Sequence, residues 1–146
     1  MFDVFLADPS HARLFDAVHE DVFDGPIIPD CLTSFLADPK QHIVVAMDGP
    51  VMVGMCSGMH HHHPDKHPDM WVNELSVAEP WRRQGLATQL IRALRAHGHH
   101  LGCREIWVVA DPTDMAEGFY TSLGWTREGS RLAMFSDTIA APVTRL

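Results

Sequence analysis

Cysteine is scarce in this chain, and its pattern argues against a disulfide framework. Cys31, Cys56 and Cys103 lie far apart, form no Cys-x-x-Cys pair and are odd in number. Small secreted domains that depend on disulfides carry an even set of cysteines. We therefore expect a reduced, intracellular protein.

Long apolar runs and an excess of basic residues are also missing. No apolar run approaches the roughly 20 residues of a membrane helix, and no basic start precedes a long apolar stretch, so we expect neither a membrane span nor a signal peptide.

Eleven Lys and Arg face nineteen Asp and Glu, which gives a formal charge of −8. A nucleic-acid binder needs a basic face, so we expect no nucleic-acid partner and a cytoplasmic location. An acidic surface attracts cationic substrates, although it can also serve solubility alone.

The pattern of apolar and breaker residues predicts a mixed α/β fold. A chain of 146 residues with 46% hydrophobic residues suits one globular domain. An Asp-Gly turn predicts an antiparallel hairpin, and a strand–helix–strand unit predicts a parallel, right-handed crossover. The expected strands span 2–6, 43–47, 51–55, 71–77 and 106–110, with one or two more in 125–135. The expected helices span 8–22, 29–36, 82–101 and 114–123, and a polar loop is expected at 60–69.

A loop with two arginines and a glycine opens the longest expected helix. Its sequence is Arg82-Arg83-Gln84-Gly85-Leu86-Ala87-Thr88. The first amides of a helix have no internal acceptors and lie at its positive end, and Gly85 allows close approach of a ligand to the backbone. The segment indicates a phosphate or pyrophosphate cradle. An ordinary glycine loop with two solvated arginines is the alternative.

The next strand is followed by a short helix that carries Tyr120, the only tyrosine of the chain. Beside the end of a parallel strand, its hydroxyl would point into a ligand crevice. The alternative is a packed ring with a satisfied hydroxyl.

These two segments resemble the signatures of the GNAT superfamily of N-acetyltransferases. Residues 82–87 match the motif Arg/Gln-x-x-Gly-x-Gly/Ala, and Ala116, Tyr120 and Gly124-Trp125 match a second motif. Where many members carry Asn before the tyrosine, this chain has Thr113. The resemblance covers nearly the whole chain. It implies one N-acetyltransferase domain over residues 1–146, with about six to seven strands, a splayed parallel strand pair and flanking helices.

The resemblance also implies how the co-substrate acetyl-CoA is bound, without a metal. The backbones of Leu75 and Val77 would bond pantetheine, and the amides of 83–88 would hold the pyrophosphate. Thr113 or Asp114 would replace the missing Asn. The implied cofactor-binding residues are Leu75, Val77, Arg82, Arg83, Gln84, Gly85, Leu86, Ala87, Thr88, Thr113 and Phe119.

Acetyl transfer to an amine needs a neutral amine and a proton for the leaving thiolate. By resemblance, Glu74 would act as the base and Tyr120 as the acid, with direct transfer in a ternary complex. A solvated carboxylate that only attracts a cation is the alternative for Glu74.

A narrower resemblance links the chain to aminoglycoside 3-N-acetyltransferases of the GNAT type, which confer antibiotic resistance. It rests on residues 19–23, 82–88, 110–111 and 120–124. Asp21, Asp24 and Glu74 would then bind the cationic acceptor, whose 3-N amine would be acetylated. The loop acids Asp65 and Asp69 could also receive its ammonium groups. For each loop acid, a solvated surface carboxylate is the alternative. Alternative acceptors are another small amine or a peptide amino group. A non-catalytic module that binds metal or CoA is the alternative to an enzyme. Whether the chain forms a homodimer stays open.

The run His60–His63, with His67 nearby, suggests transition-metal affinity. It lacks cysteines and regular ligand spacing. We therefore favour a polar loop beside the acceptor site, with no metal requirement.

Overall fold

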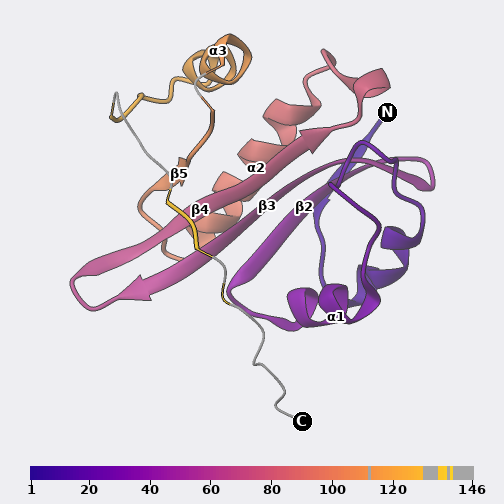
Figure 1. Ribbon diagram of the computed structural model, residues 1–146, viewed down its shortest axis with the longest axis horizontal. Coiled ribbons are helices and arrows are strands. Elements are labelled where there is room, and N and C mark those ends of the chain that lie inside the picture. Colours follow the sequence, from indigo (N-terminus) through magenta and orange to yellow (C-terminus); the bar gives the residue numbers. More distant parts are fainter. Residues whose placement is uncertain (112, 130–134, 138, 140–146) are drawn as a thin grey trace. The chain divides into compact units, whose positions relative to one another are not determined.

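A mixed sheet with the strand order β1–β2–β3–β4–β5 organises residues 1–110 (Figure 1). The neighbouring strands are antiparallel, except for the parallel pair β4–β5. The strands are β1 (Asp3–Leu6), β2 (Gln41–Asp48), β3 (Val51–His63), β4 (Lys66–Val77) and β5 (Ile106–Val108). The predicted mixed α/β class, hairpin and parallel pair are therefore confirmed.

The structure, a computed structural model, describes residues 1–111, 113–129, 135–137 and 139. Its residues group into two compact units, 1–110 and 111–146. The expected six to seven strands exceed the five that these described residues form. Residues 125–129 form no strand, and residues 130–134 of the same expected segment lie outside the described residues.

The first unit contains two 3-10 helices, η1 (Pro9–Asp16) and η2 (Glu79–Trp81), and two α-helices, α1 (Pro29–Ala37) and α2 (Leu86–His100). Asp8 caps η1 as expected, because its side chain accepts from the Ser10 amide. The expected continuation to residue 22 is wrong. The backbone of Ala17 and His19 instead bonds to Met52 of β3, which ends the helix.

Both faces of the sheet are buried along the central strand β2. On one face, residues such as Ile43, Val45 and Met55 form a core that includes Phe15 of η1. The alternate residues face α2, and a Cβ on Gly58 would lie only 2.9 Å from Leu94 Cδ2. Burial on both faces explains the continuous apolar run of β2, which does not alternate with polar residues.

The expected loop at 60–69 is instead the end of a long hairpin, visible in Figure 1. His60 pairs with Met70 and His61 pairs with Asp69, so the histidine run belongs to β3. The reason is tertiary, because the His60 side chain is buried on the sheet and the pairing continues beyond the apolar residues.

The second unit contains α3 (Asp114–Ser122), close to the expected bounds. Gly124 ends it with φ of 82°, the Trp125 amide donates to the Tyr120 carbonyl, and the Gly124 amide donates to the Thr121 carbonyl. These bonds form a Schellman motif, which confirms the predicted glycine stop.

Candidate active site

Among the residues that the structure describes, no strand pairs with β4 along half of one edge. Its pairing with β5 ends at Val72, opposite Val108, although β4 continues to Val77. The register with β3 also shifts between Ser57 and Gly58, which leaves Asn73 as an extra residue on β4. A bulge beside the point where two parallel strands separate is a frequent feature of functional sites.

The backbone groups of Leu75 and Val77 point to this free edge. The Ala78 amide donates to the Val53 carbonyl at 2.8 Å, which turns Ala78 toward β3. In an antiparallel pair, successive residues direct their N–H and C=O groups to opposite sides. Leu75 and Val77 therefore face away from β3, where an extended ligand could bond them as an added strand would.

The loop after β4 carries left-handed residues, a backbone arrangement that forms nests of amides. Arg83 and Gly85 adopt positive φ values of 63° and 80°, and Gly85 is the N-cap of α2. The expected start of this helix at residue 82 is therefore wrong. These left-handed residues interrupt the helix, which begins at Leu86. Gln89 is the residue whose amide bonds to the Gly85 carbonyl, so the earlier amides of α2 have no intrahelical acceptor. Such a nest suits a phosphate anion.

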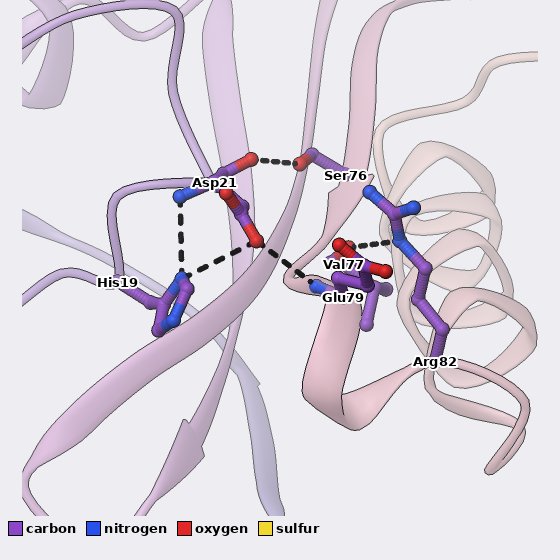
Figure 2. Close-up of polar contacts among 6 residues, drawn as sticks. All are labelled: His19, Asp21, Ser76, Val77, Glu79 and Arg82. Atoms are coloured by element: carbon purple, nitrogen blue, oxygen red, sulfur yellow. Dashed lines mark hydrogen bonds and ion pairs between the residues drawn. The ribbon is translucent and has the colours of Figure 1, made fainter.

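Arg82 ties this loop to the end of β4. Its Nε donates to the Val77 carbonyl at 2.8 Å, as Figure 2 shows. The guanidinium therefore positions the loop against the strand as well as contributing positive charge. Leu86 is buried in the core, so only its backbone is available to a ligand.

Asp21, an expected acceptor ligand, holds two segments together in the structure. Its carboxylate accepts from the Glu79 amide at 3.2 Å, and its carbonyl accepts from Ser76 Oγ at 3.1 Å (Figure 2). His19 Nδ1 accepts from the Asp21 amide and lies 3.7 Å from its carboxylate. The contacts of Asp21 with Ser76 and Glu79 span more than fifty residues of sequence, and no local signal predicts them.

Glu74 lies on β4 beyond the end of the pairing with β5, and its side chain is exposed. Desolvation, followed by the negative charge of Asp24, raises the pKa of Glu74 above its usual value. The structure therefore brings together two of the three expected acceptor residues. A carboxylate with a raised pKa is a better proton acceptor near neutral pH.

Asp24 also lines an open pocket of about 610 Å³. Its wall combines apolar and acidic side chains, including Phe15, Phe23, Ile27, Asp16, Glu20 and Asp24. Sequence reasoning missed most of these residues. The available signal was the gathering of acidic and aromatic or aliphatic residues within the short segment 15–27.

Three expected site residues belong to the second unit. Thr113 is the N-cap of α3, and its Oγ1 accepts from the Ala116 amide at 3.3 Å. The ring of Tyr120 lies 5.0 Å from that of Phe119 and 5.2 Å from that of Trp125. Tyr120 is half-buried on α3.

The histidine-rich hairpin does not form a metal centre in the part of the chain that the structure describes. No group of three or more His, Cys, Asp or Glu side chains is arranged there to hold an ion. His63 bonds to Asp65 instead.

The helices in the described part of the chain are too short or too polar to span a membrane.

Comparisons with known proteins bear on the family and on the fold. The family model described as the acetyltransferase (GNAT) family matches residues 7–125. No curated protein matches the chain.

Solved structures share the fold at low identity. An aminoglycoside acetyltransferase, meta-AAC0020, from an uncultured soil metagenomic sample and in complex with sisomicin, is 22% identical, with a TM-score of 0.79 over 95% of this chain and 97% of that one. The aminoglycoside N-acetyltransferase AAC(6')-Iy in complex with CoA is 20% identical, with a TM-score of 0.76 over 96% of both chains. A transcriptional regulator from Bacillus halodurans C-125 is 18% identical, with a TM-score of 0.74 over 93% of this chain and 100% of that one.

Proposed function

Because this chain belongs to the acetyltransferase (GNAT) family and is an N-acetyltransferase that uses acetyl-CoA, we propose that its acceptor is a primary amine of a cationic amino sugar of the aminoglycoside class. The acidic pair Glu74 and Asp24 carries this proposal. The two carboxylates lie close enough for Asp24 to raise the pKa of Glu74. An ammonium group between them would relieve their repulsion.

The donor side is formed by backbone groups. Acetyl-CoA supplies the acetyl group as an activated thioester. The free-edge groups of Leu75 and Val77 bond its pantetheine arm, and the Val77 amide polarises the thioester carbonyl. The amides of the loop at 83–88 hold the pyrophosphate, assisted by the charges of Arg82 and Arg83. Their observed directions and positive φ values support this assignment.

Glu74 removes the proton from the acceptor amine, directly or through water. Its raised pKa favours this role, since proton transfer is most effective when the base titrates nearer to the working pH. Tyr120 protonates the departing thiolate. This second role rests on the family motif that Tyr120 matches, together with Ala116 and Gly124. Thr113 and Phe119 of α3 contribute to the pantetheine site on the same ground.

The regiochemistry forms part of the proposal. The resemblance to the 3-N-acetyltransferases implies transfer to the 3-N amine, whereas AAC(6')-Iy, a structural neighbour, is named for a different position. The reaction forms an amide at one amine of the acceptor, so the structure of the product shows which amine was acetylated.

Another small amine or a peptide amino group is the second candidate acceptor. The apolar part of the pocket wall, with Phe15, Phe23 and Ile27, favours an amine on an apolar body. An amino sugar would contact mainly the acidic residues of the same wall.

A panel of acceptors tests the proposal. The purified protein is incubated with acetyl-CoA and sisomicin, glucosamine or a short peptide with a free amino terminus. We expect mass spectrometry to show one added acetyl group on sisomicin at the highest rate, and NMR to place it on the 3-N amine. Faster acetylation of the peptide would overturn the amino-sugar assignment. Stabilisation by zinc but no turnover with any acceptor would instead indicate a binding module.

A further inference from the structure

Two tryptophans stack on the sheet near Glu74, and the site described above does not use them. Trp71 of β4 pairs with Trp107 of β5 in the parallel register. Their ring centroids lie 5.8 Å apart and their planes are inclined by 21°. The Trp107 indole N–H donates to Asp69 Oδ2 at 3.0 Å, and the residue stays 37% exposed. We call Trp71, Trp107 and Asp69 the tryptophan shelf.

The bulge in β4 places the tryptophan shelf on the same face as Glu74. Glu74 pairs with Ser57 and Trp71 pairs with Met59. Ser57 and Met59 lie two residues apart on β3 and therefore share a face, as do cross-strand partners. Without the extra residue Asn73, side chains three positions apart on β4 would point to opposite faces. The shelf and Glu74 are thus separated by two residues of β3, or about 7 Å.

The chemistry of the shelf suits a cation. The face of an indole attracts ammonium groups, and tryptophan does so best among the aromatic residues. Asp69 adds a carboxylate at the rim, with Oδ1 lying 3.6 Å from His61 Nδ1. The formal charge of −8 favours the approach of positively charged molecules to this face.

We propose that the tryptophan shelf is a second cation subsite, which binds an ammonium group other than the one being acetylated. The enzyme would thereby select diamines and polyamines over monoamines. This inference rests on the proposed function, because Glu74 must face the reacting amine. The acceptor would carry two ammonium groups on the order of 7 Å apart, the separation of the two positions along the sheet.

The shelf is tested with sisomicin, which carries several amines, and glucosamine, which carries one. Trp107→Leu removes the aromatic face and should lower the preference for sisomicin in kcat/KM by roughly 3- to 30-fold, the range of a cation–π contact. The loss should appear in the KM for sisomicin, with little change for glucosamine. Trp107→Phe keeps an aromatic face and should retain most of the preference. Asp69→Asn keeps an acceptor for the indole N–H, removes the charge and should also raise the KM for sisomicin.

Binding of the same two probes to the CoA-loaded protein, measured by calorimetry, separates the two proposals. If the wild type acetylates sisomicin but Trp107→Leu keeps its full preference, the subsite is wrong and the proposed function stands. If sisomicin binds in a Trp107-dependent manner without being acetylated, the subsite stands and the proposed function is wrong. Equal affinity of the wild type for sisomicin and glucosamine would overturn the subsite regardless of turnover.

Discussion

Glu74 and Asp24 act as a pair, although fifty positions separate them in the sequence. Partial desolvation, followed by the negative charge of Asp24, disfavours the charged form of Glu74 and raises its pKa. Because both effects raise the pKa of Glu74, both make its carboxylate a better proton acceptor. The kinetic behaviour of Glu74 variants should therefore depend on pH.

Glu74→Gln keeps the shape of the side chain and removes its basicity. We expect kcat to fall by roughly 10²- to 10⁴-fold, the usual contribution of a general base. The loss should be largest above the raised pKa of Glu74 and below the pKa of the amine, where the base is ionised and the acceptor arrives protonated. The measurement is the pH profile of kcat for both proteins. A higher KM with unchanged kcat would instead show that Glu74 only attracts the cation.

Asp24→Asn provides the matched control for this assignment. It removes the charge that helps to raise the pKa of Glu74. The acidic limb of the kcat profile should therefore move to lower pH, while the limb itself remains. An unshifted limb would show that Glu74 is not the group that titrates.

Tyr120→Phe keeps the aromatic ring between Phe119 and Trp125 and removes the hydroxyl. We expect kcat to fall by roughly 10²- to 10⁴-fold, with little change in the affinity for acetyl-CoA. Steady-state kinetics and calorimetry measure the two quantities. Turnover at the wild-type rate would remove Tyr120 from the mechanism, provided that single-turnover kinetics give the same result.

At the scale of elements, the N-terminus of α2 is expected to hold the pyrophosphate. Acetyl-CoA binds the folded cradle and should stabilise the protein by about 2.7 kcal/mol at a hundredfold excess over Kd. Gly85→Asp adds strain at a φ of 80° and a negative charge beside the phosphates, so this stabilisation should disappear. Thermal unfolding with and without acetyl-CoA measures the effect.

Gly102→Asp separates backbone strain from ligand binding. Gly102 has a φ of 83°, has open space around its Cβ position as Gly85 does, and lies beyond the other end of α2. This variant should lose intrinsic stability and keep the full shift with acetyl-CoA. Equal loss of the shift in both variants would contradict the placement of the cradle.

The other half of α2 carries a buried histidine chain that links three elements. His42 Nε2 lies 2.7 Å from His60 Nδ1, and His42 Nδ1 lies 3.0 Å from His97 Nε2. Three neutral rings satisfy both bonds, because His42 then donates one and accepts the other. Burial, with the charges of His97 and His60, lowers the pKa of His42 to about 4. Desolvation also lowers the pKa values of His60 and His97.

The histidine chain should make the fold sensitive to acid. The folded pKa of His42 is about 4, against an ordinary value of 6.5, so between these values the unfolded chain binds more protons. The stabilisation is complete above pH 6.5 and is lost as the pH falls toward 4. We expect the free energy of unfolding to drop by about 1–2 kcal/mol between pH 7 and pH 5.

Urea unfolding at the two pH values measures this loss. The charged and titratable neighbours Asp38, Lys40, His61, His62 and His100 also act on the chain. These neighbours are unchanged in the variant His42→Gln, which should make the free energy of unfolding less dependent on pH. The variant His99→Gln, at an exposed position, is the control and should leave the pH dependence unchanged. An undiminished pH dependence in His42→Gln would refute the role of the histidine chain.

At the scale of the whole molecule, the negative charge should assist capture of the acceptor. Exposed charges are screened beyond about 10 Å at 0.1 M salt. Raising the ionic strength should therefore increase the KM for sisomicin severalfold, and the KM for glucosamine less, because glucosamine carries one charge. Steady-state kinetics at several salt concentrations tests this. An equal effect on both acceptors would show that long-range attraction does not select the polycation.

Local signals were sufficient for several parts of the molecule. Asp48-Gly49 predicted the hairpin, Gly124 predicted the end of α3, and Gly85 predicted a loop before the longest helix. Each depends on the backbone preferences of a few consecutive residues. The same kind of reasoning extended η1 too far and made a loop of the histidine run, since pairing with Met52 and Met70 lies outside any local window.

The sequence by itself determined the mixed α/β class, the order of most elements and the glycine loop that precedes α2, because apolar periodicity, turn residues and left-handed glycines act within short stretches of chain. Only the tertiary structure decided which side chains share a face. The bulge at Asn73 turns Trp71 toward the side of Glu74, and the bonds from Ser76 and Glu79 to Asp21 fasten a distant loop to β4. A shift of one residue reverses every later side chain in a strand, and such a shift depends on contacts between residues far apart in sequence.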